Sequence, residues 1–533
     1  MIRPRLPSAR PPLSLPLLLA QALTCALAAC SPAIASAPTA LLAPDSVLVV
    51  RLESLRAWDE LDQALGRDAD GPTLLRTTLD GLTRPAPGAA PRAELDEGRP
   101  LYFGLSLDPA QRPAWTLLTP VTNGRALHLE GTRETRVHRG YAAATSRPSL
   151  PLASRPTALA DELAPGLCAA RVDLARLVAA YRPLIDTGLR QLGAELDRER
   201  IQAPVARAVL ELYLEEAPRV LDAARSLDLA LAREGEELVA RLGFVESTAP
   251  VPSGPRAELE PLAARLDPSA RFQLVFNGTV AQLHGQTASL FAGLEALLTV
   301  VFPERGPLHT LGTLASLTEP GLALALAPGP DGLHAAALVR SGQPAELVDG
   351  LAQRLEAPAD VPGPVQLGAE RRLAHAGLEL RLWPLELDGA GLAHVVAAAL
   401  ELPGDSGDGL ASELAQRFEQ LEGEHLFALG HSGGLVLVAL APDEEHLRAD
   451  LGRLRDGSAP TPGWTRLLGR CEPGSLALVG RLDLRWPTGP APAPDAEPAP
   501  LELGFWVSAR GSEGELGACT RLAQLRAVLA SPR

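Results

Sequence analysis

One short stretch of the sequence has the residue types and the spacing of a serine nucleophile. Gly430-His431-Ser432-Gly433-Gly434 fits the Gly-x-Ser-x-Gly pattern, in which a serine on a tight turn attacks a carbonyl carbon. That chemistry requires a strand, a turn and then a helix, with a histidine further along the chain. Here the turn leads into Leu435 to Leu440, a run typical of a second strand, and only His446 follows. We therefore predict a hairpin turn at Ser432.

A second stretch has the outline of a protease site. Gly404-Asp405-Ser406-Gly407-Asp408 resembles the Gly-Asp-Ser-Gly-Gly of chymotrypsin-like proteases, but it ends in Asp and no Ala-Ala-His-Cys precedes it. The acidic spacing of a calcium-binding loop is also incomplete. We expect an ordinary loop at this place. Asn277-Gly278-Thr279 has the form of a glycosylation site, and we interpret it as a turn.

The ten histidines are scattered along the chain. None forms His-x-x-x-His or His-Glu-x-x-His, so the sequence offers no helical zinc site. His425 and His431 bracket an expected strand, and we interpret them as surface or strand-edge residues. No glycine-rich phosphate loop occurs either. We therefore expect no catalytic residues, no metal and no cofactor.

The N-terminus carries the most specific signal in the chain. Three arginines within the first ten residues precede an apolar run from Leu13 to Leu27, which is short for a transmembrane helix. The run ends in Leu27-Ala28-Ala29-Cys30, which resembles the lipobox of bacterial lipoproteins. The resemblance implies that Cys30 is acylated, becomes the first mature residue and anchors the protein to a membrane.

The lipobox implies a location in the bacterial cell envelope, facing the periplasm or the cell surface. In enterobacterial lipoproteins an Asp after the acylated cysteine favours retention in the inner membrane. Ser31 stands there in this chain, so the outer membrane is favoured. The alternative is a plain secretory signal cut after Ala35 or Ala37, which would leave a secreted or periplasmic soluble protein.

The composition limits the kinds of partner. The chain has 533 residues, a formal net charge of -15 and 46% hydrophobic residues, which suits several folded units. A surface this acidic repels phosphate backbones, so we expect no nucleic acid partner. The partners that remain are the membrane, through the N-terminal lipid, and an envelope protein.

The five cysteines have different expected fates. Cys25 leaves with the signal peptide and Cys30 carries the lipid. Cys168 lies in an apolar run and is interpreted as a small buried hydrophobic residue. Cys471 and Cys519 flank the last unit, and an exported protein could bridge them. Spacing alone does not fix their geometry, and we favour two unpaired buried thiols.

A proline-led stretch recurs along the chain and indicates a repeated unit. It is a proline, an apolar run, and then Arg-apolar-acid or a similar end. The recurring copies are Pro44–Glu53, Pro165–Asp173, Pro473–Asp483 and, more loosely, Pro268–Asn277. Each apolar run is expected to lie in a sheet and to lead into a helix. We interpret the charged ends as solvated.

The recurrence divides the chain into seven parts. They are 1–29 (signal peptide), 30–43 (tether), 44–164, 165–266, 267–364, 365–464 (an irregular unit) and 465–533, the last with a Pro/Ala-rich linker at 487–500. Each unit is expected to contain a strand, one or two helices, a hairpin and a helix. A step of this length is too long for a solenoid.

These patterns predict an α+β fold of duplicated strand-helix-hairpin-helix units, with mainly antiparallel sheets and helices packed on one face. In this respect the chain resembles bacterial exported proteins built from duplicated α+β domains. The leading functional hypothesis is a non-catalytic, lipid-anchored envelope binding or scaffold component. A carrier that holds an apolar ligand between sheet and helices is the second. A serine hydrolase using Ser432 is the weakest.

Overall fold

The structure is a computed structural model, and it describes most of the chain beyond the expected signal peptide. The described residues are 38–66, 94–107, 111–125, 132–147, 158–198, 204–246, 257–280, 282, 316–329, 332–355, 364–375, 377–400, 422–457, 459–485, 500–510 and 512–530. The expected signal peptide, Cys30 and the 404–408 loop lie outside these residues.

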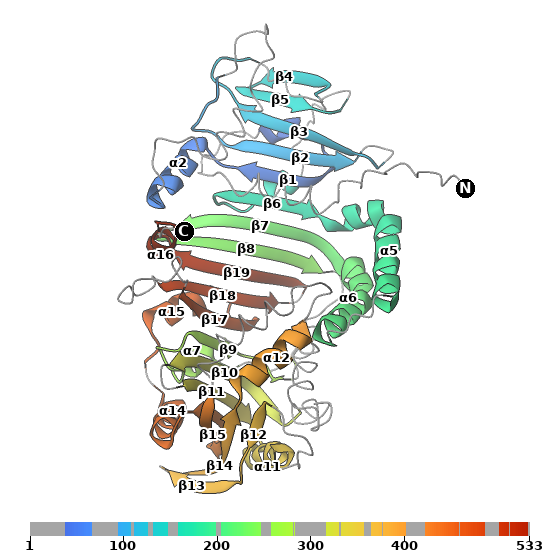
Figure 1. Cartoon of the computed structure of the whole chain (residues 1–533). Helices are drawn as coiled ribbons and strands as arrows, with labels where there is room; N and C mark the ends of the chain where they lie inside the picture. Colours follow the sequence, from blue (N-terminus) through green and yellow to red (C-terminus); the bar gives the residue numbers. More distant parts are fainter. Residues whose placement is uncertain are drawn as a thin grey trace, which may run out of the picture.

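The described strands join into one continuous sheet of 19 strands, not the separate sheets that we expected (Figure 1). The strands are β1 (Ser46–Leu52), β2 (Leu101–Leu107), β3 (Pro113–Pro120), β4 (Glu134–His138), β5 (Tyr141–Thr145), β6 (Cys168–Asp173), β7 (Ala224–Glu234), β8 (Glu237–Glu246), β9 (Phe272–Phe276), β10 (Thr318–Gly329), β11 (Gly332–Ser341), β12 (Val365–Leu367), β13 (Arg371–His375), β14 (Leu378–Leu387), β15 (Gly423–Ser432), β16 (Leu435–Ala441), β17 (Leu476–Arg485), β18 (Pro500–Arg510) and β19 (Glu513–Arg521). Every neighbouring pair among them is antiparallel.

The sheet consists mainly of three-stranded runs. Neighbouring runs meet alternately through their first strands and through their last strands. Each run is a first strand followed by a hairpin: β1–β2–β3, β6–β7–β8, β9–β10–β11, β14–β15–β16 and β17–β18–β19. First strands pair with first strands, as Val50 faces Ala170 and Leu274 faces Gly480. Last strands pair with last strands, as Leu242 faces Leu516 and Leu338 faces Leu437. Joining the runs in this way pairs strand edges that separate sheets would leave open.

The proline-led stretches behave as predicted in the sheet. The apolar runs that follow Pro44, Pro165, Pro268 and Pro473 lie in β1, β6, β9 and β17. Helices follow β1 and β6 as expected, and Ser54 caps the first of them by accepting a hydrogen bond from the Ala57 amide (3.3 Å). The helix expected after β9 lies outside the described residues, and the next described element after β17 is β18.

The helices cover both faces of the sheet, so the expectation of one covered face is wrong. They are η1 (Pro38–Leu41), α2 (Leu55–Ala64), α4 (Ala158–Asp161), α5 (Leu174–Arg198), α6 (Pro204–Ala223), α7 (Leu259–Ala263), α11 (Pro344–Leu355), α12 (Gly389–Leu400), α14 (Glu444–Asp456), α15 (Pro462–Leu468) and α16 (Leu522–Ala530). The neighbours Ala428 and Leu429 point to opposite faces, and they pack with α14 and α11, respectively. Strands as apolar as β15 and β16 need cover on both sides.

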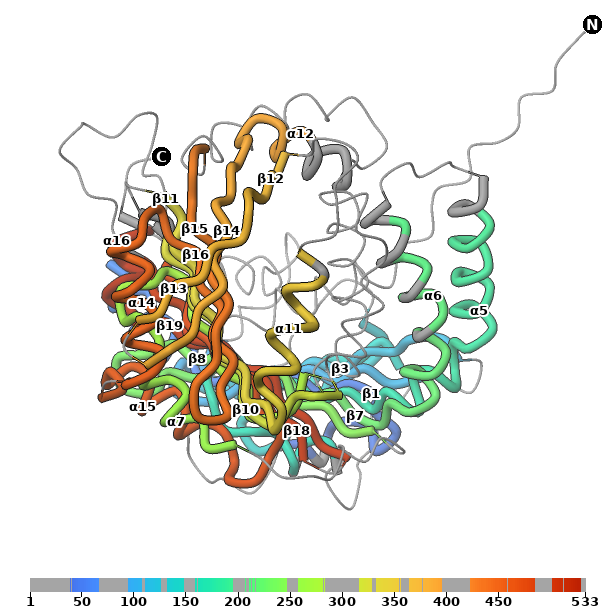
Figure 2. The backbone as a smooth tube through the Cα atoms, turned by 90° about the horizontal axis from the view of Figure 1, so that it is seen from below, coloured from blue at the N-terminus to red at the C-terminus, as the bar shows by residue number. Residues whose placement is uncertain are grey.

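We name the two faces by the residues that alternate along the middle strands. The inner face carries Cys168, Leu229, Leu242, Leu516 and Phe505, and it packs with α2, α5 and α16 near one end and α11 near the other. Seen from below, the sheet curves around α11, and α5 and α6 stand at its side (Figure 2). The outer face packs with α7, α14 and α15.

Candidate functional site

The Ser432 stretch forms a hairpin, as the sequence predicts. Ser432 ends β15 and lies opposite Leu435, the first residue of β16. Gly433 and Gly434 form the turn with φ angles of 54° and 81°, a conformation that favours glycine. The strand-turn-helix geometry of a nucleophile is therefore missing here. A residue of an exposed hairpin turn would be open to solvent, but Ser432 is half-buried.

His446, the histidine that a Ser432 mechanism would need, is engaged elsewhere. It lies at the start of α14, where its Nδ1 is 2.8 Å from Oδ2 of Asp443. Its ring also meets the ring of His334 edge-on, with 5.0 Å between the centroids. In the described part of the chain, no hydrogen bond joins a histidine to Ser432.

His425 is buried, so its interpretation as a surface or edge residue is wrong. Its Nε2 accepts a hydrogen bond from the Leu333 amide (3.2 Å), and its Nδ1 lies 3.3 Å from the Gly423 carbonyl oxygen. This pattern suits a neutral imidazole with both nitrogens satisfied. Among the described residues no group of three or more His, Cys, Asp or Glu side chains could hold a metal ion.

The three cysteines of the described residues are free thiols, including Cys471 and Cys519. Burial raises the pKa of Cys168 to about 12. Burial, together with the charge of Glu515, raises the pKa of Cys471 to about 11. Thiols with pKa values this high are poor nucleophiles near neutral pH, so they favour a structural role.

The strand-end arginines are paired and largely buried, so the expectation of solvated charges is wrong. Arg51 lies 3.4 Å from Glu53, and Arg481 lies 2.9 Å from Glu502. Arg171 contacts Asp228 at 3.2 Å. Local sequence shows only the Arg51 pair, because the other partners come from neighbouring strands.

A shallow apolar cavity of about 270 Å³ lies on the inner face, at the middle of the sheet. Ala240 and Ala518 face each other at its centre, and larger side chains on the same face surround them. Leu516 and Val507 beside it are 43% and 36% exposed, which is high for aliphatic residues in a sheet. The lining side chains on this face are Cys168, Ala170, Leu229, Leu231, Ala240, Leu242, Phe505, Leu516 and Ala518.

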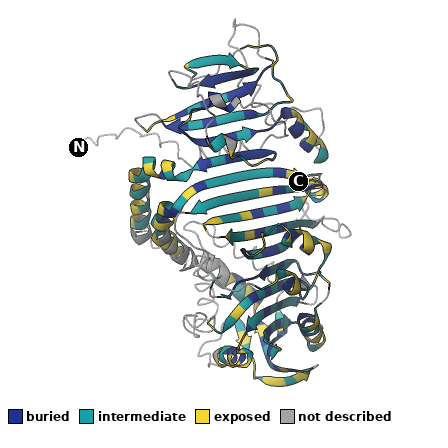
Figure 3. Cartoon of the chain, turned by 180° about the vertical axis from the view of Figure 1, so that it is seen from behind, coloured by how far each residue is buried: buried dark blue, intermediate teal, exposed yellow. Residues whose placement is uncertain are grey.

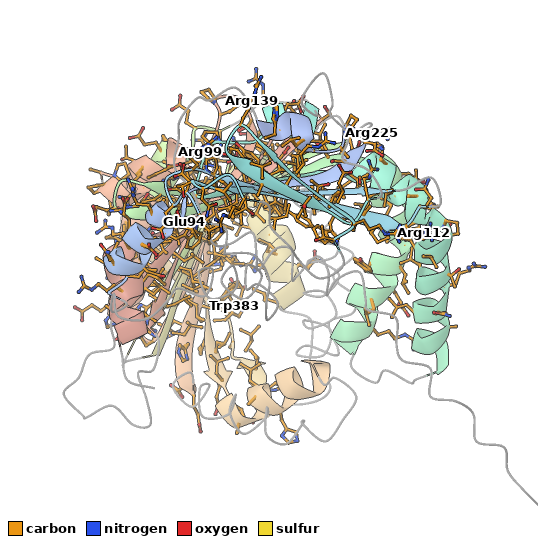
Figure 4. The ribbon with its side chains drawn as sticks, turned by 90° about the horizontal axis from the view of Figure 1, so that it is seen from above. Glu94, Arg99, Arg112, Arg139, Arg225 and Trp383 are labelled. Carbon is orange, nitrogen blue, oxygen red and sulfur yellow. The ribbon has the colours of Figure 1, made fainter. Side chains whose placement is uncertain are left out.

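The inner face stays apolar and only half-buried beyond this cavity. Leu478, Leu274 and Leu324 continue the same face across β17, β9 and β10, and all three are half-buried. Their outer-face neighbours are buried instead, for example Val275 and Val479. In Figure 3 the middle strands accordingly show long stretches of intermediate exposure. Towards one end α11 covers this face, where Trp383 packs among its side chains (Figure 4).

A larger cleft of about 480 Å³ lies on the outer face of the same strands. Its walls are the segment before β6 and the segment between α15 and β17, and its floor is formed by β6, β7, β8, β19 and β18. Charged and polar groups line it: Glu162, Arg171, Asp228, Arg241, Arg470, Glu472, Ser475, Ser508, Arg510, Glu513 and Glu515. Burial raises the pKa of Asp228, although the nearby Arg171 acts in the opposite direction.

A partly buried ion-pair network includes Arg241 and Arg470, which line this cleft. Arg470 binds both Glu234 and Glu237 at 2.8 Å, and Arg466 binds Glu237 at 2.9 Å. Arg241 pairs with Glu234 at 2.5 Å. The network ties the end of α15 to the β7–β8 hairpin.

Neither cavity could be located from the sequence. The period-two pattern of β7 and β8 shows that one face is apolar, but it does not reveal that β19 lies beside β8. The Ala240 and Ala518 pair that forms the centre of the inner cavity is separated by 278 positions in numbering. The sequence did contain a weak signal for the cavities. Glycine and alanine interrupt strands that otherwise carry large side chains, and such gaps can mark a place that a ligand approaches.

Comparisons with known proteins give little further guidance. No protein-family model matches the chain, and no curated protein matches it. The structural alignment with crystal form IV of TP0453 covers 51% of this chain and 98% of the TP0453 chain, with 11% sequence identity and a TM-score of 0.26. Crystal form III of TP0453 covers 52% and 99%, also at 11% identity, with a TM-score of 0.25. Similarity this low carries no argument about this chain. No described helix is both long and apolar enough to cross a membrane.

Proposed function

We propose that this protein is a non-catalytic, lipid-anchored component of the bacterial cell envelope that holds an apolar ligand on its inner face. The lipobox ending in Cys30 supports the anchor. The half-exposed apolar inner face supports the binding role. The two features are independent, since the lipobox precedes the first strand in the sequence and the apolar face lies in the middle of the sheet.

The observation that carries the binding role is the cavity around Ala240 and Ala518. Contiguous apolar surface left open on a folded protein marks a place for a ligand or a partner. Covering such surface contributes about 25 cal/mol per Å² of apolar area removed from water. The cavity side chains offer no strong hydrogen-bonding group. The part of a ligand that enters it is therefore hydrocarbon.

A scaffold role is the second candidate, and a different surface favours it. Leu184 on α5 and Tyr213 and Val220 on α6 are exposed large hydrophobic residues. Such residues suit contact with another envelope protein. Binding of an apolar ligand and contact through α5 and α6 are compatible in one protein.

A serine hydrolase has less support, because Ser432 lies in a glycine hairpin. Ser432→Ala is expected to change the free energy of unfolding by less than about 0.5 kcal/mol. Covalent labelling of Ser432 by a fluorophosphonate probe would reverse this order of hypotheses.

We also infer that the three-stranded runs derive from a duplicated unit that corresponds to the sequence units at 44–164, 165–266, 267–364, 365–464 and 465–533. Their alternating arrangement and the proline-led first strands support this. Superposition of the separate runs tests it. Runs that do not share a common path for their first strand and hairpin would argue against duplication.

A fluorescent fatty-acid titration tests the ligand-binding proposal. The mature chain should bind the probe saturably with one site. Ala518→Trp should weaken binding by about tenfold or more, because the indole fills the cavity. Ala523→Trp is the matched control, since Ala523 is an exposed residue of α16. Equal probe binding by wild type and Ala518→Trp, with both proteins folded, would reject the inner cavity as the site.

A further inference from the structure

The floor of the outer cleft contains one cross-strand row with a distinctive charge pattern. Arg171, Asp228, Gly243, Glu515 and Ser508 lie opposite one another in the strand register. They belong to β6, β7, β8, β19 and β18, which are neighbours in this order in Figure 1. The row therefore places a carboxylate on each side of a glycine. We propose that an ammonium or guanidinium group of a small ligand binds above Gly243, between Asp228 and Glu515.

The spacing of the strands suits a cation at this point. Asp228 and Glu515 are two strand spacings apart, which is about 10 Å. Their side chains lie on the same face as Gly243, where the glycine leaves the space between them open. Both carboxylates can therefore approach one group held above Gly243. A charge-assisted hydrogen bond from a cation to each carboxylate would be stronger than a neutral one.

Each carboxylate is already oriented through one of its oxygens. Oδ1 of Asp228 forms an ion pair with Nη1 of Arg171 at 3.2 Å. Oε1 of Glu515 accepts a hydrogen bond from the Trp506 indole at 2.7 Å. Among the contacts established for the described residues, the second oxygen of each group remains for a ligand. Orientation by neighbouring groups reduces the entropy that a ligand must remove on binding.

The backbone conformation at position 243 does not require a glycine. It is absent from the described residues with positive φ, and a Cβ added there would lie 3.5 Å from the Asp228 Cβ, an ordinary contact distance. A side chain could thus be accommodated without moving the backbone. What the glycine provides is free space between the two carboxylates.

Five carboxylates and four arginines line the cleft, and each arginine is already paired. Arg171 is shared by Glu162 (2.8 Å) and Asp228 (3.2 Å). Arg470 and Arg241 are held by Glu234, and Arg470 also by Glu237. Arg510 pairs with Glu472 at 3.0 Å. Glu515 receives its hydrogen bond from a neutral indole, so its charge is not balanced in that contact. The cleft volume of about 480 Å³ is in the range of small-molecule sites.

Calorimetric titration of the full chain with agmatine, which carries a guanidinium and an ammonium group, tests the proposal. We expect saturable binding to one site, and no binding of a neutral diol of similar length. Glu515→Gln keeps an acceptor for Trp506 but removes the charge, so it should weaken agmatine binding by about tenfold, which is about 1.4 kcal/mol. Gly243→Val should abolish binding by filling the space.

Two controls separate this site from the rest of the protein. Glu60→Gln removes the same charge from an exposed position of α2 and should leave agmatine binding unchanged. Ala518→Trp blocks the inner cavity and should also leave it unchanged, so this proposal can fail while the inner-face proposal holds, and the reverse. Absence of saturable binding, or equal affinity in wild type and folded Glu515→Gln, would overturn the cationic site.

Discussion

The side-chain amide of Asn277 donates a hydrogen bond to the backbone carbonyl of Ser475 (2.9 Å), which lies 198 residues further along the chain. Its carbonyl oxygen accepts from the Ala477 amide at 2.8 Å. One buried side chain thus joins the end of β9 to the start of β17, where two three-stranded runs meet. Asn277 lies at a bend directly after β9, and its side chain is buried.

Asn277→Ala should therefore destabilise the sheet at this junction. It leaves two buried backbone groups without partners, and we expect a loss of about 2 kcal/mol in the free energy of unfolding. Urea denaturation measures the change. Asn123→Ala is the control, since its half-buried side chain accepts a hydrogen bond from the Arg125 amide in an exposed turn (3.3 Å), and it should lose much less. Equal losses in the two variants would contradict the role assigned to Asn277.

Glu53 gives the protein a pH-dependent stability. Burial raises the pKa of this side chain to about 7, with the charge of Arg51 acting in the opposite direction. In the unfolded chain the pKa of this side chain is near 4.5. Between pH 4.5 and about pH 7, the folded protein therefore binds more protons at Glu53 than the unfolded chain does. Stability from this group is therefore greatest at low pH and falls as the pH rises towards 7, by at most about 3 kcal/mol.

Glu53→Gln should remove this pH dependence. Relative to wild type, the variant should gain stability at pH values above about 7 and little or none near pH 4. Urea unfolding at the two pH values provides the comparison, and Glu60→Gln at an exposed position of α2 should leave the profile unchanged. If the stability of the wild type does not fall between about pH 4 and pH 7, Glu53 ionises in the folded protein with little loss of stability.

Glu237 should be much more important for stability than the exposed Glu472. The Glu237 carboxylate is 8% exposed and binds Arg466 and Arg470, whereas Glu472 is 67% exposed and binds one exposed arginine. Glu237→Gln removes the charge that balances buried Arg470 and should cost about 3 kcal/mol. Glu472→Gln should cost about 0.5 kcal/mol or less. Thermal unfolding of the two variants compares them, and similar losses would contradict the network.

The anchor proposal makes a prediction about location in the cell. Cys30→Ala should move the protein from the membrane fraction to the soluble fraction and abolish labelling by a fatty-acid analogue. Ser31→Ala alters the next residue without removing the thiol, so it should remain labelled. Unchanged fractionation of Cys30→Ala would reject the lipid anchor.

Local patterns in the sequence predict strands well and their partners poorly. Two runs rich in apolar residues, 101–107 and 114–119, with a polar turn between them, predict a hairpin from local signals alone. The structure has these runs as β2 and β3. The small strands β4 and β5 were not expected, since Ala142, Ala143 and Ala144 carry little strand propensity of their own. The pairing of β5 with β3, and of β4 with β5, orders them.

The two candidate sites depend on pairings that no local pattern contains. Gly243 acquires its two carboxylates only because β7 pairs with one edge of β8 and β19 with the other. Period-two alternation predicts that Arg241 and Gly243 share a face, but it does not predict which helices cover that face. Residues distant in the chain therefore decide both sites.

The central claim is that the inner face of the sheet holds an apolar ligand. The most direct measurement is solvent extraction of the protein purified from its own membrane, followed by mass spectrometry of the extract. Extraction removes a bound molecule but leaves any lipid attached covalently to Cys30. We predict an apolar molecule in about equal molar amount with wild type and with Ala523→Trp, and its loss from folded Ala518→Trp. The same yield from all three proteins, or none from wild type, would contradict the claim.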